Sequence, residues 1–341
     1  MDGSKIKNME EFAALSGLSR PTVSKYFNDP KSVRASTRTR IESAREKYDY
    51  HPNIFAMNQN RKLTKNVGIV VPYLVDPFFA ELARHVETHC IEAGFRPNLF
   101  SAHGNAEFER EILEGFRSHK PAGVLIAPLG ATSDRSALEK FALDIPTVIF
   151  DSGVDDESLP FVGSDCDQFA EMMVDFLCET GEPPCFLDMQ TPSNPNAKER
   201  RAGYIAAMLA RGEEPQIVSV PGVGWDFEDI GMREGAIAIA ERRFATNTVL
   251  CSNDRLAIGF IAACFERGLR VGRSVDCDFR VAGQDDHPFS RFTCPALTTV
   301  AQDYESIARR AVETLVDTLD GGAAGSRNTR FEGKLVLRSS A

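Results

Sequence analysis

Residues 9–28 read MEEFAALSGLSRPTVSKYFN, a stretch that predicts two short helices joined by a tight turn. Asn8 stands where a helix cap is expected, and Gly17 is the residue type that leaves a helix most cheaply. Ser19 then caps a second helix, with Pro21 in its first turn, where the missing N–H does no harm. The stretch is therefore predicted to form a helix-turn-helix unit.

Apolar residues in this stretch recur at helical spacing, so each helix is predicted to turn an apolar stripe toward the other. The stripes consist of Phe12 and Leu15 on the first helix and Val23 and Phe27 on the second. The remaining side chains at the start of the second helix stay outside, where a recognition helix reads the major groove: Arg20, Pro21, Thr22, Ser24 and Lys25. An ordinary three-helix unit fits this window about as well.

The charge distribution favours the DNA-binding alternative. Residues 1–65 hold 13 Lys and Arg against seven Asp and Glu, a net charge of +6. The whole chain carries −10, so the remainder carries −16. A basic head on an acidic body is what a phosphate-binding module joined to a different kind of module would show.

Composition excludes several classes of protein. The 341 residues are 43% hydrophobic, but no continuous apolar run of membrane-spanning length occurs, and the first residues are polar. We expect a cytoplasmic protein without a membrane partner. The eight cysteines lie far apart with no CxxC pair, which favours buried thiols over metal ligands or disulfides. GxSxG, P-loop and HExxH motifs and a GxGxxG after a strand are absent, so we expect neither an enzyme nor a cofactor.

From residue 66 onward, apolar strand-like runs alternate with helical segments, which predicts doubly wound parallel sheets in two lobes. The strands are expected within residues 67–74, 95–102, 122–129, 146–151, 185–189, 215–220, 248–254, 278–286, 296–303 and 334–338. The helices are expected at residues 77–93, 107–118, up to 142, 165–179, 198–211, 231–244, 256–268 and 304–319, after a third head helix at 36–47.

Polar residues follow several of the apolar strands, at the edge where such sheets bind ligands. These residues are Asp76, Asp151, Asn253, Asp254 and Asp285. Aromatic faces suited to stacking on a sugar ring stand at Phe78, Phe79, Trp225 and Tyr304. Each also has a structural reading, as a helix cap, a turn former or a core residue.

Three motifs together resemble the LacI/GalR family of bacterial transcription regulators. They are LSGLSRPTVSKYFND at residues 15–29, the third helix, and YDYHPN at residues 48–53. The resemblance continues over essentially the whole chain. It implies an all-α helix-turn-helix DNA-binding head followed by an α/β periplasmic-binding-protein-like core of two doubly wound parallel-sheet lobes.

The resemblance also implies a division of the chain. Residues 1–50 form the helix-turn-helix domain and residues 51–65 a hinge that becomes helical on DNA. Residues 66–161 with about 295–322 form the amino-terminal core lobe. Residues 162–294 with about 323–341 form the carboxy-terminal, effector-binding lobe.

The implied DNA contacts lie in the head and the hinge. They comprise Ser19, Arg20, Pro21, Thr22, Ser24, Lys25, Asn28, Asn53, Met57 and Gln59. Family members usually place Leu where this chain has Gln59, and that Leu wedges between base pairs. An amide cannot replace it cheaply, so we expect a gentler bend, with Gln59 bonding base edges or Met57 acting as the wedge.

The third helix departs from the family pattern, because Arg34 stands where a Ser cap is usual. Ser36 could take over the capping with a shortened first turn. Arg34, Arg38 and Arg40 could contact phosphates, although a solvated basic face is an equally good interpretation.

The core residues that match effector contacts in the family are Asp151, Arg200, Trp225, Asn253, Asp285 and Gln302. Arg200 is the expected anchor, since a guanidinium binds hydroxyl pairs or a carboxylate at two points. Asp76, Phe78 and Phe79 complete the predicted effector-binding set. Gln284 beside Asp285 is an unusual choice that leaves the ligand open.

The resulting hypothesis is a homodimeric, ligand-responsive repressor of carbohydrate or carbon-metabolism genes. It would bind a near-palindromic operator and hold a sugar-like effector between its core lobes. The alternative is a cytoplasmic sugar-binding protein of the periplasmic-binding-protein type without a gene-regulatory role. The residues do not decide whether the effector releases or promotes DNA binding.

Overall fold

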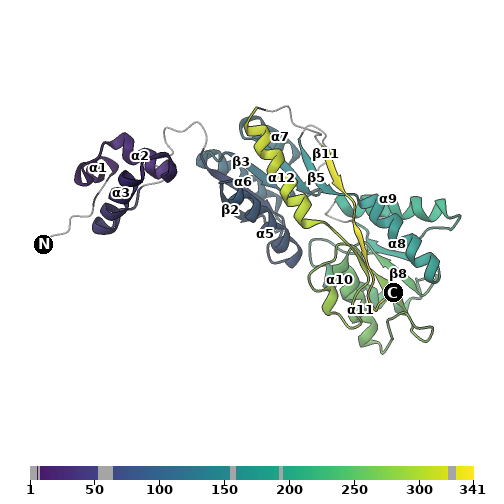
Figure 1. Ribbon diagram of the computed structural model, residues 1–341. Helices are drawn as coiled ribbons and strands as arrows, with labels where there is room; N and C mark the ends of the chain where they lie inside the picture. Colours follow the sequence, from purple (N-terminus) through teal and green to yellow (C-terminus); the bar gives the residue numbers. More distant parts are fainter. Residues whose placement is uncertain (1–5, 7, 53–63, 154–158, 192–194, 322–327) are drawn as a thin grey trace. The chain divides into compact units, whose positions relative to one another are not determined.

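The computed structural model describes residues 6, 8–52, 64–153, 159–191, 195–321 and 328–341. The chain separates into two compact units, Met1–Thr64 and Lys65–Ala341 (Figure 1). In its described residues the first unit contains helices and no strands, and the second contains parallel sheets with helices around them and one small antiparallel sheet. This is the fold class that the sequence predicted.

The head consists of α1 (Met9–Ser16), α2 (Arg20–Asn28), the short 3-10 helix η1 (Pro30–Ser32) and α3 (Ala35–Tyr48). The Asn8 side chain accepts a hydrogen bond from the backbone N–H of Glu11 at 2.9 Å, and Ser19 accepts one from that of Thr22 at 3.3 Å. Gly17 ends α1 in the left-handed region, with a φ of 63°. The predicted caps and turn are confirmed.

The head core is built around Phe12, Val23 and Ile41, which are all fully buried. Tyr50 stacks on Phe12 with 4.3 Å between ring centroids, so the segment after α3 closes this core. The prediction for Leu15 is wrong, because 49% of its surface is exposed.

The beginning of α3 also differs from the prediction. The helix begins at Ala35, one residue before Ser36, and Arg34 at the cap position makes no side-chain cap hydrogen bond. Ser36 therefore lies inside the first turn and is not the N-cap residue. Arg38 Nε donates to the carbonyl oxygen of Pro30 at 3.0 Å, which ties α3 to η1. The hinge predictions for Asn53, Met57 and Gln59 lie outside the described residues.

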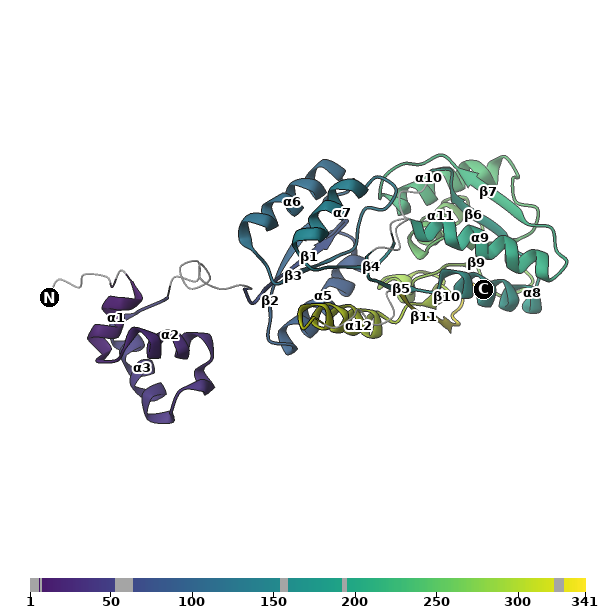
Figure 2. The same ribbon diagram turned by 90° about the horizontal axis from the view of Figure 1, so that it is seen from above.

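The amino-terminal lobe holds a six-stranded parallel sheet in the order β11-β5-β4-β3-β1-β2. Its helices lie on both faces, with α6 and α7 on one side and α5 and α12 on the other (Figure 2). The strands are β1 (Asn66–Val71), β2 (Arg96–Ser101), β3 (Gly123–Ile126), β4 (Thr147–Asp151), β5 (Phe161–Ser164) and β11 (Asn328–Phe331). The helices are α5 (Pro77–Glu92), α6 (Ala106–His119), α7 (Arg135–Asp144) and α12 (Tyr304–Leu319).

The carboxy-terminal lobe holds a four-stranded parallel sheet in the order β7-β6-β8-β9. Successive β6 side chains enter different cores, Phe186 that of α8 and α9 and Leu187 that of α10 and α11. The strands are β6 (Cys185–Met189), β7 (Gln216–Val220), β8 (Thr248–Cys251) and β9 (Arg280–Ala282). The helices are α8 (Cys166–Thr180), α9 (Pro195–Ala210), α10 (Phe227–Ala240) and α11 (Asp254–Glu266).

Two strands of the amino-terminal sheet lie where the sequence division placed the other lobe. Residues 162–164 of β5 and all of β11 extend the six-stranded sheet, so β11 belongs to the same lobe as α12. Both strands are four residues long, and β11 alternates exposed and half-buried positions, so neither shows a long apolar run. A small antiparallel sheet pairs β10 (Thr299–Ala301) with β12 (Lys334–Val336).

Candidate functional site

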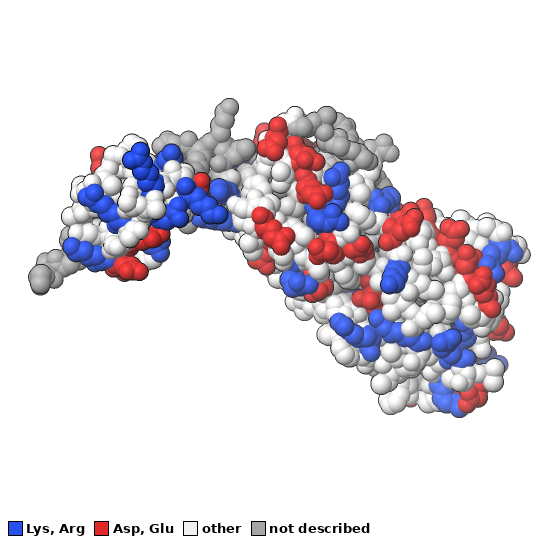
Figure 3. Space-filling view, in the orientation of Figure 1, with Lys and Arg blue, Asp and Glu red and all other residues white. Residues whose placement is uncertain are grey.

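The exposed end of α2 is the candidate DNA-binding surface. Of the predicted head contacts, Ser19, Arg20, Pro21, Lys25 and Asn28 are exposed, while Thr22 and Ser24 are half-buried. Ser19 Oγ and Thr22 Oγ1 lie 2.8 Å apart within the cap, so these two hydroxyls are already hydrogen-bonded. Figure 3 shows Lys and Arg side chains in blue over the visible face of the head. This surface is basic and open to a partner.

A pocket lies beyond the carboxyl ends of strands from both lobes of the core. All nine residues of the predicted effector-binding set line it: Asp76, Phe78, Phe79, Asp151, Arg200, Trp225, Asn253, Asp285 and Gln302. Asp151 is the last residue of β4, while Asn253 follows β8 and Asp285 follows β9. Parallel strands bring these distant segments to one edge, which is why strand ends were informative.

Arg200 on α9 is held by a buried network on one side of the pocket. Its Nη2 donates to Asp285 Oδ1 at 2.5 Å, and its Nη1 donates to the carbonyl oxygen of Ser252 at 2.9 Å. Gln302 Nε2 donates to the same Asp285 oxygen at 2.7 Å and accepts at Oε1 from Ser164 Oγ at 2.8 Å. The predicted anchor is thus already paired with a predicted neighbour.

Asp151 is the pocket carboxylate without a partner. Only 1% of the residue is exposed, and neither carboxylate oxygen has a hydrogen-bond partner among the described residues. Its backbone lies in the left-handed region with a φ of 67°, a strained conformation of the kind that functional sites retain. Burial raises the pKa of this carboxyl to about 8, and the negative charge of Asp285 adds to the effect.

Asp76 joins the two lobes through buried contacts with charged groups. It caps α5 by accepting from the backbone N–H of Phe78, and Arg255 Nη1 on α11 donates to its Oδ2 at 2.6 Å. His287 Nε2 lies 3.3 Å from its other oxygen. Arg255 also donates to Glu228 at 2.8 and 2.9 Å. The Asp76 carboxylate is therefore committed to a contact between lobes.

Aromatic rings form the apolar wall of the pocket. Phe79 and Trp225 meet edge to face with 5.6 Å between centroids, and Phe227 lies 6.0 Å from Trp225. Tyr304, predicted as a further stacking face, is not among the lining residues. Its ring contacts Phe78, and its hydroxyl donates to the carbonyl oxygen of Asp285 at 3.1 Å, so it supports the wall from behind.

The two residues after β8 have different surroundings. Asn253 lines the pocket and also caps α11, accepting from the backbone N–H of Leu256 at 2.8 Å. Asp254 is fully buried outside the pocket and accepts from Ser290 Oγ and Thr299 Oγ1, both at 2.6 Å. Gln284 is also fully buried and does not line the pocket, so it gives no information on the ligand.

Sequence reasoning missed five residues that line the pocket: Asn196, Ala197, Phe227, Arg255 and His287. The first two lie on α9 one turn before Arg200, a spacing that could have flagged them. No motif marks His287 or Arg255. The role of Arg255 becomes visible only through its contact with Asp76, 179 positions away in the chain.

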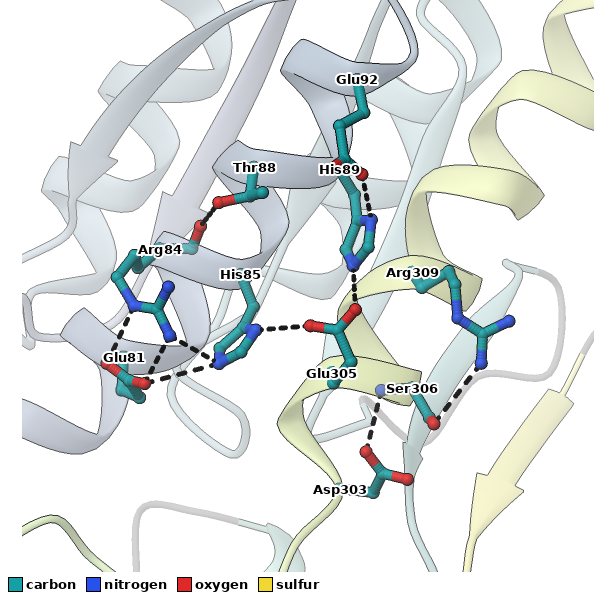
Figure 4. A network of polar contacts seen from close by, with 10 residues as sticks. All are labelled: Glu81, Arg84, His85, Thr88, His89, Glu92, Asp303, Glu305, Ser306 and Arg309. Atoms are coloured by element: carbon teal, nitrogen blue, oxygen red, sulfur yellow. Dashed lines mark hydrogen bonds and ion pairs between the residues drawn. The ribbon is translucent and has the colours of Figure 1, made fainter.

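Helix α5, whose first turn lines the pocket, is joined further along its length to the first turn of α12. Glu305 on α12 lies between two imidazoles of α5, with His85 Nδ1 at 2.8 Å and His89 Nε2 at 2.8 Å (Figure 4). His89 Nδ1 in turn lies 3.1 Å from Glu92. The hydrogen bonds from both histidines lower the pKa of Glu305. The joint formed by Glu305, His85 and His89 therefore holds α12 against α5, the helix that begins directly after Asp76.

No group of three or more metal-ligating side chains with suitable geometry occurs among the described residues. In the same part of the chain, none of the helices combines the length and the apolar character that crossing a membrane requires.

Comparison with known proteins adds to this geometry. The head, residues 8–53, matches the family described as "Bacterial regulatory proteins, lacI family". Residues 181–341 match the "Periplasmic binding protein-like domain". The chain belongs to the LacI family. Its basic head is the LacI-type DNA-binding domain, and its pocket lies in the periplasmic-binding-protein-like core.

Similar proteins cover this LacI-family chain almost completely. The HTH-type transcriptional repressor PurR of Pasteurella multocida is 26% identical over 339 residues, which is 98% of each chain. A lac repressor dimer bound to operator and the anti-inducer ONPF superposes with a TM-score of 0.83 at 23% identity, covering 98% of this chain and 99% of that one. The complex of the regulator CelR with cellobiose reaches 0.70 at 25% identity and covers 98% and 100%.

Proposed function

We propose that this chain is a ligand-responsive, sequence-specific transcriptional repressor of carbohydrate or carbon-metabolism genes, with a small sugar-like effector bound between the two core lobes. The observation that carries the proposal is the pocket, where carboxylate, guanidinium and amide groups face an aromatic wall. Such a combination suits a hydroxyl-rich ligand with an apolar ring face.

Repression and assembly are supported by the relatives. The curated relative is named as a repressor, and a similar solved structure is a repressor dimer on operator DNA. A homodimer would present two copies of the exposed α2 surface to the halves of a near-palindromic operator. Arg20, Pro21 and Lys25 would contact base edges, while Thr22 and Ser24 would hold phosphates.

The effector must bind one core state better than the other in order to change DNA affinity. The contact of Arg255 with Asp76 offers a place for this difference, because it crosses between lobes at the pocket wall. A ligand that fits only when this contact is formed favours the corresponding arrangement of the core. The complex of CelR with cellobiose supports a sugar as the ligand class.

The test combines two readouts on the full chain. Genomic fragments that the protein retains at moderate salt are used to measure DNA affinity by fluorescence anisotropy across a salt series. A specific operator should give a steep salt slope and discrimination against random competitor. Trp225 is the only tryptophan and lies in the pocket wall, so its fluorescence reports effector binding independently.

Separate variants distinguish the two activities. Lys25→Ala on the exposed face of α2 should weaken DNA binding and leave the Trp225 response to effector unchanged. Trp225→Phe should abolish the fluorescence signal while leaving unliganded DNA affinity intact. If the purified protein prefers no genomic fragment over random competitor, with or without sugars, the repressor function is rejected.

A further inference from the structure

We propose that the effector carries a protonated amine beside its hydroxyl groups, and that Asp151 is the residue that selects this amine. The inference rests on the proposed function, because it specifies the ligand of the same pocket. It depends on three observations: an unpartnered carboxylate, arginine head groups engaged elsewhere, and a surplus of acidic side chains around the cavity.

The Asp151 carboxylate is held in place without being used. The Asp151 carbonyl accepts from Asn196 Nδ2 at 3.4 Å, and the residue closes β4 in the left-handed conformation, so its backbone position is fixed. Both carboxylate oxygens are buried and have no hydrogen-bond donor among the described residues. A buried carboxylate in this state is costly unless a partner brings hydrogen bonds and opposite charge.

The positive charges of the pocket are engaged elsewhere. Arg200 directs its two terminal nitrogens at Asp285 and the Ser252 carbonyl. Arg255 directs its nitrogens at Asp76, Glu228 and the Trp225 carbonyl. The terminal nitrogens of both guanidinium groups are therefore engaged by other acceptors. The buried Nε of Arg200 has no hydrogen-bond partner among the described residues, and the charge of Arg200 offsets part of the rise in the pKa of Asp151.

The side chains around the cavity leave a negative surplus. Three carboxyl groups line it, from Asp76, Asp151 and Asp285, against two guanidinium groups and the imidazole of His287. Glu228 adds a further carboxylate on Arg255. A cleft with one dominant sign of charge and low-dielectric walls attracts ligands of the opposite sign. A ligand carboxylate or phosphate would meet repulsion here, whereas an ammonium group would restore the balance.

A ligand that carries only hydroxyl groups does not balance the excess of acidic side chains around the cavity. A hydroxyl can donate a hydrogen bond to the Asp151 carboxyl but brings no positive charge, so burial continues to favour the protonated form. An ammonium group supplies both several donors and the missing charge. The aromatic wall of Phe79, Trp225 and Phe227 suits the apolar face of a ring. The ligand class that combines these features is an amino sugar or another aminated polyol.

The experiment uses the full-length protein and matched sugars. Glucose, galactose and mannose are each titrated as the neutral sugar, the 2-amino-2-deoxy sugar and the uronic acid, and binding is followed by Trp225 fluorescence. For at least one skeleton the amine form should bind at least tenfold more tightly than the neutral form, and no uronic acid should bind. Equal binding by the neutral sugars, tighter binding by an acid, or no binding by any amine overturns the inference.

Asp151→Asn tests the assignment to this residue. Asn has the same shape, tolerates the left-handed backbone, and breaks no side-chain contact seen among the described residues. The ratio of amine to neutral affinity should fall to about one. Asp286→Asn is the matched control, because Asp286 pairs with Arg338 outside the pocket. An unchanged ratio in Asp151→Asn would refute the role of Asp151.

The same experiment separates the two proposals. If a neutral sugar binds the pocket at least as tightly as its amine form and changes operator affinity, the repressor function stands and the amine inference fails. If an amino sugar binds the pocket but no genomic fragment is retained, the amine inference stands and the repressor function fails.

Discussion

The polar side chains of the head and those of the pocket differ in exposure and in where their hydrogen-bond partners come from. In the head, the side chains proposed to act are exposed, and hydrogen bonds such as those of Asn8 and Ser19 join residues three positions apart. In the pocket, the acting side chains are buried, and their partners come from distant parts of the chain, as Arg200 and Asp285 show. The head leaves its charged side chains exposed to a binding partner, whereas most charged side chains of the pocket are paired with each other.

This difference predicts where substitutions will be felt. An exposed basic residue on α2 contributes to binding and little to folding, since exposed charges are well solvated. A buried arginine in the pocket contributes to both, because its loss leaves a carboxylate without compensation. Substitutions of exposed basic residues in the head should therefore change DNA binding without changing stability. Substitutions of buried arginines in the core should change both ligand binding and stability.

The largest effect is expected from Arg255→Met, which breaks the contact between lobes. Asp76 would lose its buried partner, and removing one member of a buried pair costs about 3–5 kcal/mol. Urea unfolding of the full chain, followed by Trp225 fluorescence, should show this loss. Arg270→Met is the matched control, because the pair of Arg270 with Asp276 is exposed and worth less than about 1 kcal/mol. Similar losses in both variants would show that burial of the ion pair does not decide its contribution to stability.

Asp151→Asn should produce a smaller, pH-dependent effect of opposite sign. Burial raises the folded-state pKa of Asp151 from 3.8 to about 8. A raised pKa means that the wild-type protein is most stable below the unfolded value and loses stability as pH rises toward 8. Where the folded state binds one proton more than the unfolded state, stability falls by about 1.4 kcal/mol for each step of one in pH. The variant should therefore gain about 3–4 kcal/mol over wild type between pH 5 and pH 8.

Thermal or urea unfolding across this pH range measures the gain. Some pH dependence should persist in the variant, because burial also raises the pKa of Asp254 to about 7. If the stability of wild type and of Asp151→Asn changes with pH in the same way, the Asp151 carboxylate has a stabilising partner in the folded protein and the prediction is wrong.

The same contrast explains what could be predicted from the sequence. The caps at Asn8 and Ser19 and the turn at Gly17 were predictable because each acts within a few residues. The predicted effector-binding residues were found because they follow apolar runs or match family positions, and parallel strands bring the strand ends to one edge. Periodicity and spacing carry this local information.

The remaining features depend on contacts that no local pattern encodes. Arg255 and His287 line the pocket because chain segments far apart in sequence meet there, and a single arginine within α11 carries no signal of this. Leu15 matched the apolar spacing yet is exposed, while Tyr50 from beyond α3 stacks on Phe12 and helps to close the head core. The short strands β5 and β11 escaped prediction for lack of an apolar run.

In the head, Arg20→Ala should reduce operator affinity by about 1–3 kcal/mol if the side chain reads a base edge, and it should relax sequence preference at one position. The stability of the head should change little, since Arg20 is exposed. Anisotropy titrations against the operator and single-base variants measure both effects. A uniform loss on all sequences, with a salt slope reduced by about one, would instead assign Arg20 to a phosphate.

The smallest effect is expected from Glu305→Gln at the joint between α5 and α12, where an exposed carboxylate binds His85 and His89. Hydrogen bonds from the histidines lower the pKa of Glu305, so its contribution is present above the unfolded value and is lost as pH falls through the folded value. The variant should therefore be slightly less stable than wild type at neutral pH and equal to it in acid. Thermal unfolding at pH 3 and pH 7 measures this difference, with Glu313→Gln on the same helix as the control. A larger loss in acid than at neutral pH would show that the joint is held by packing of the two helices and not by the charge of Glu305.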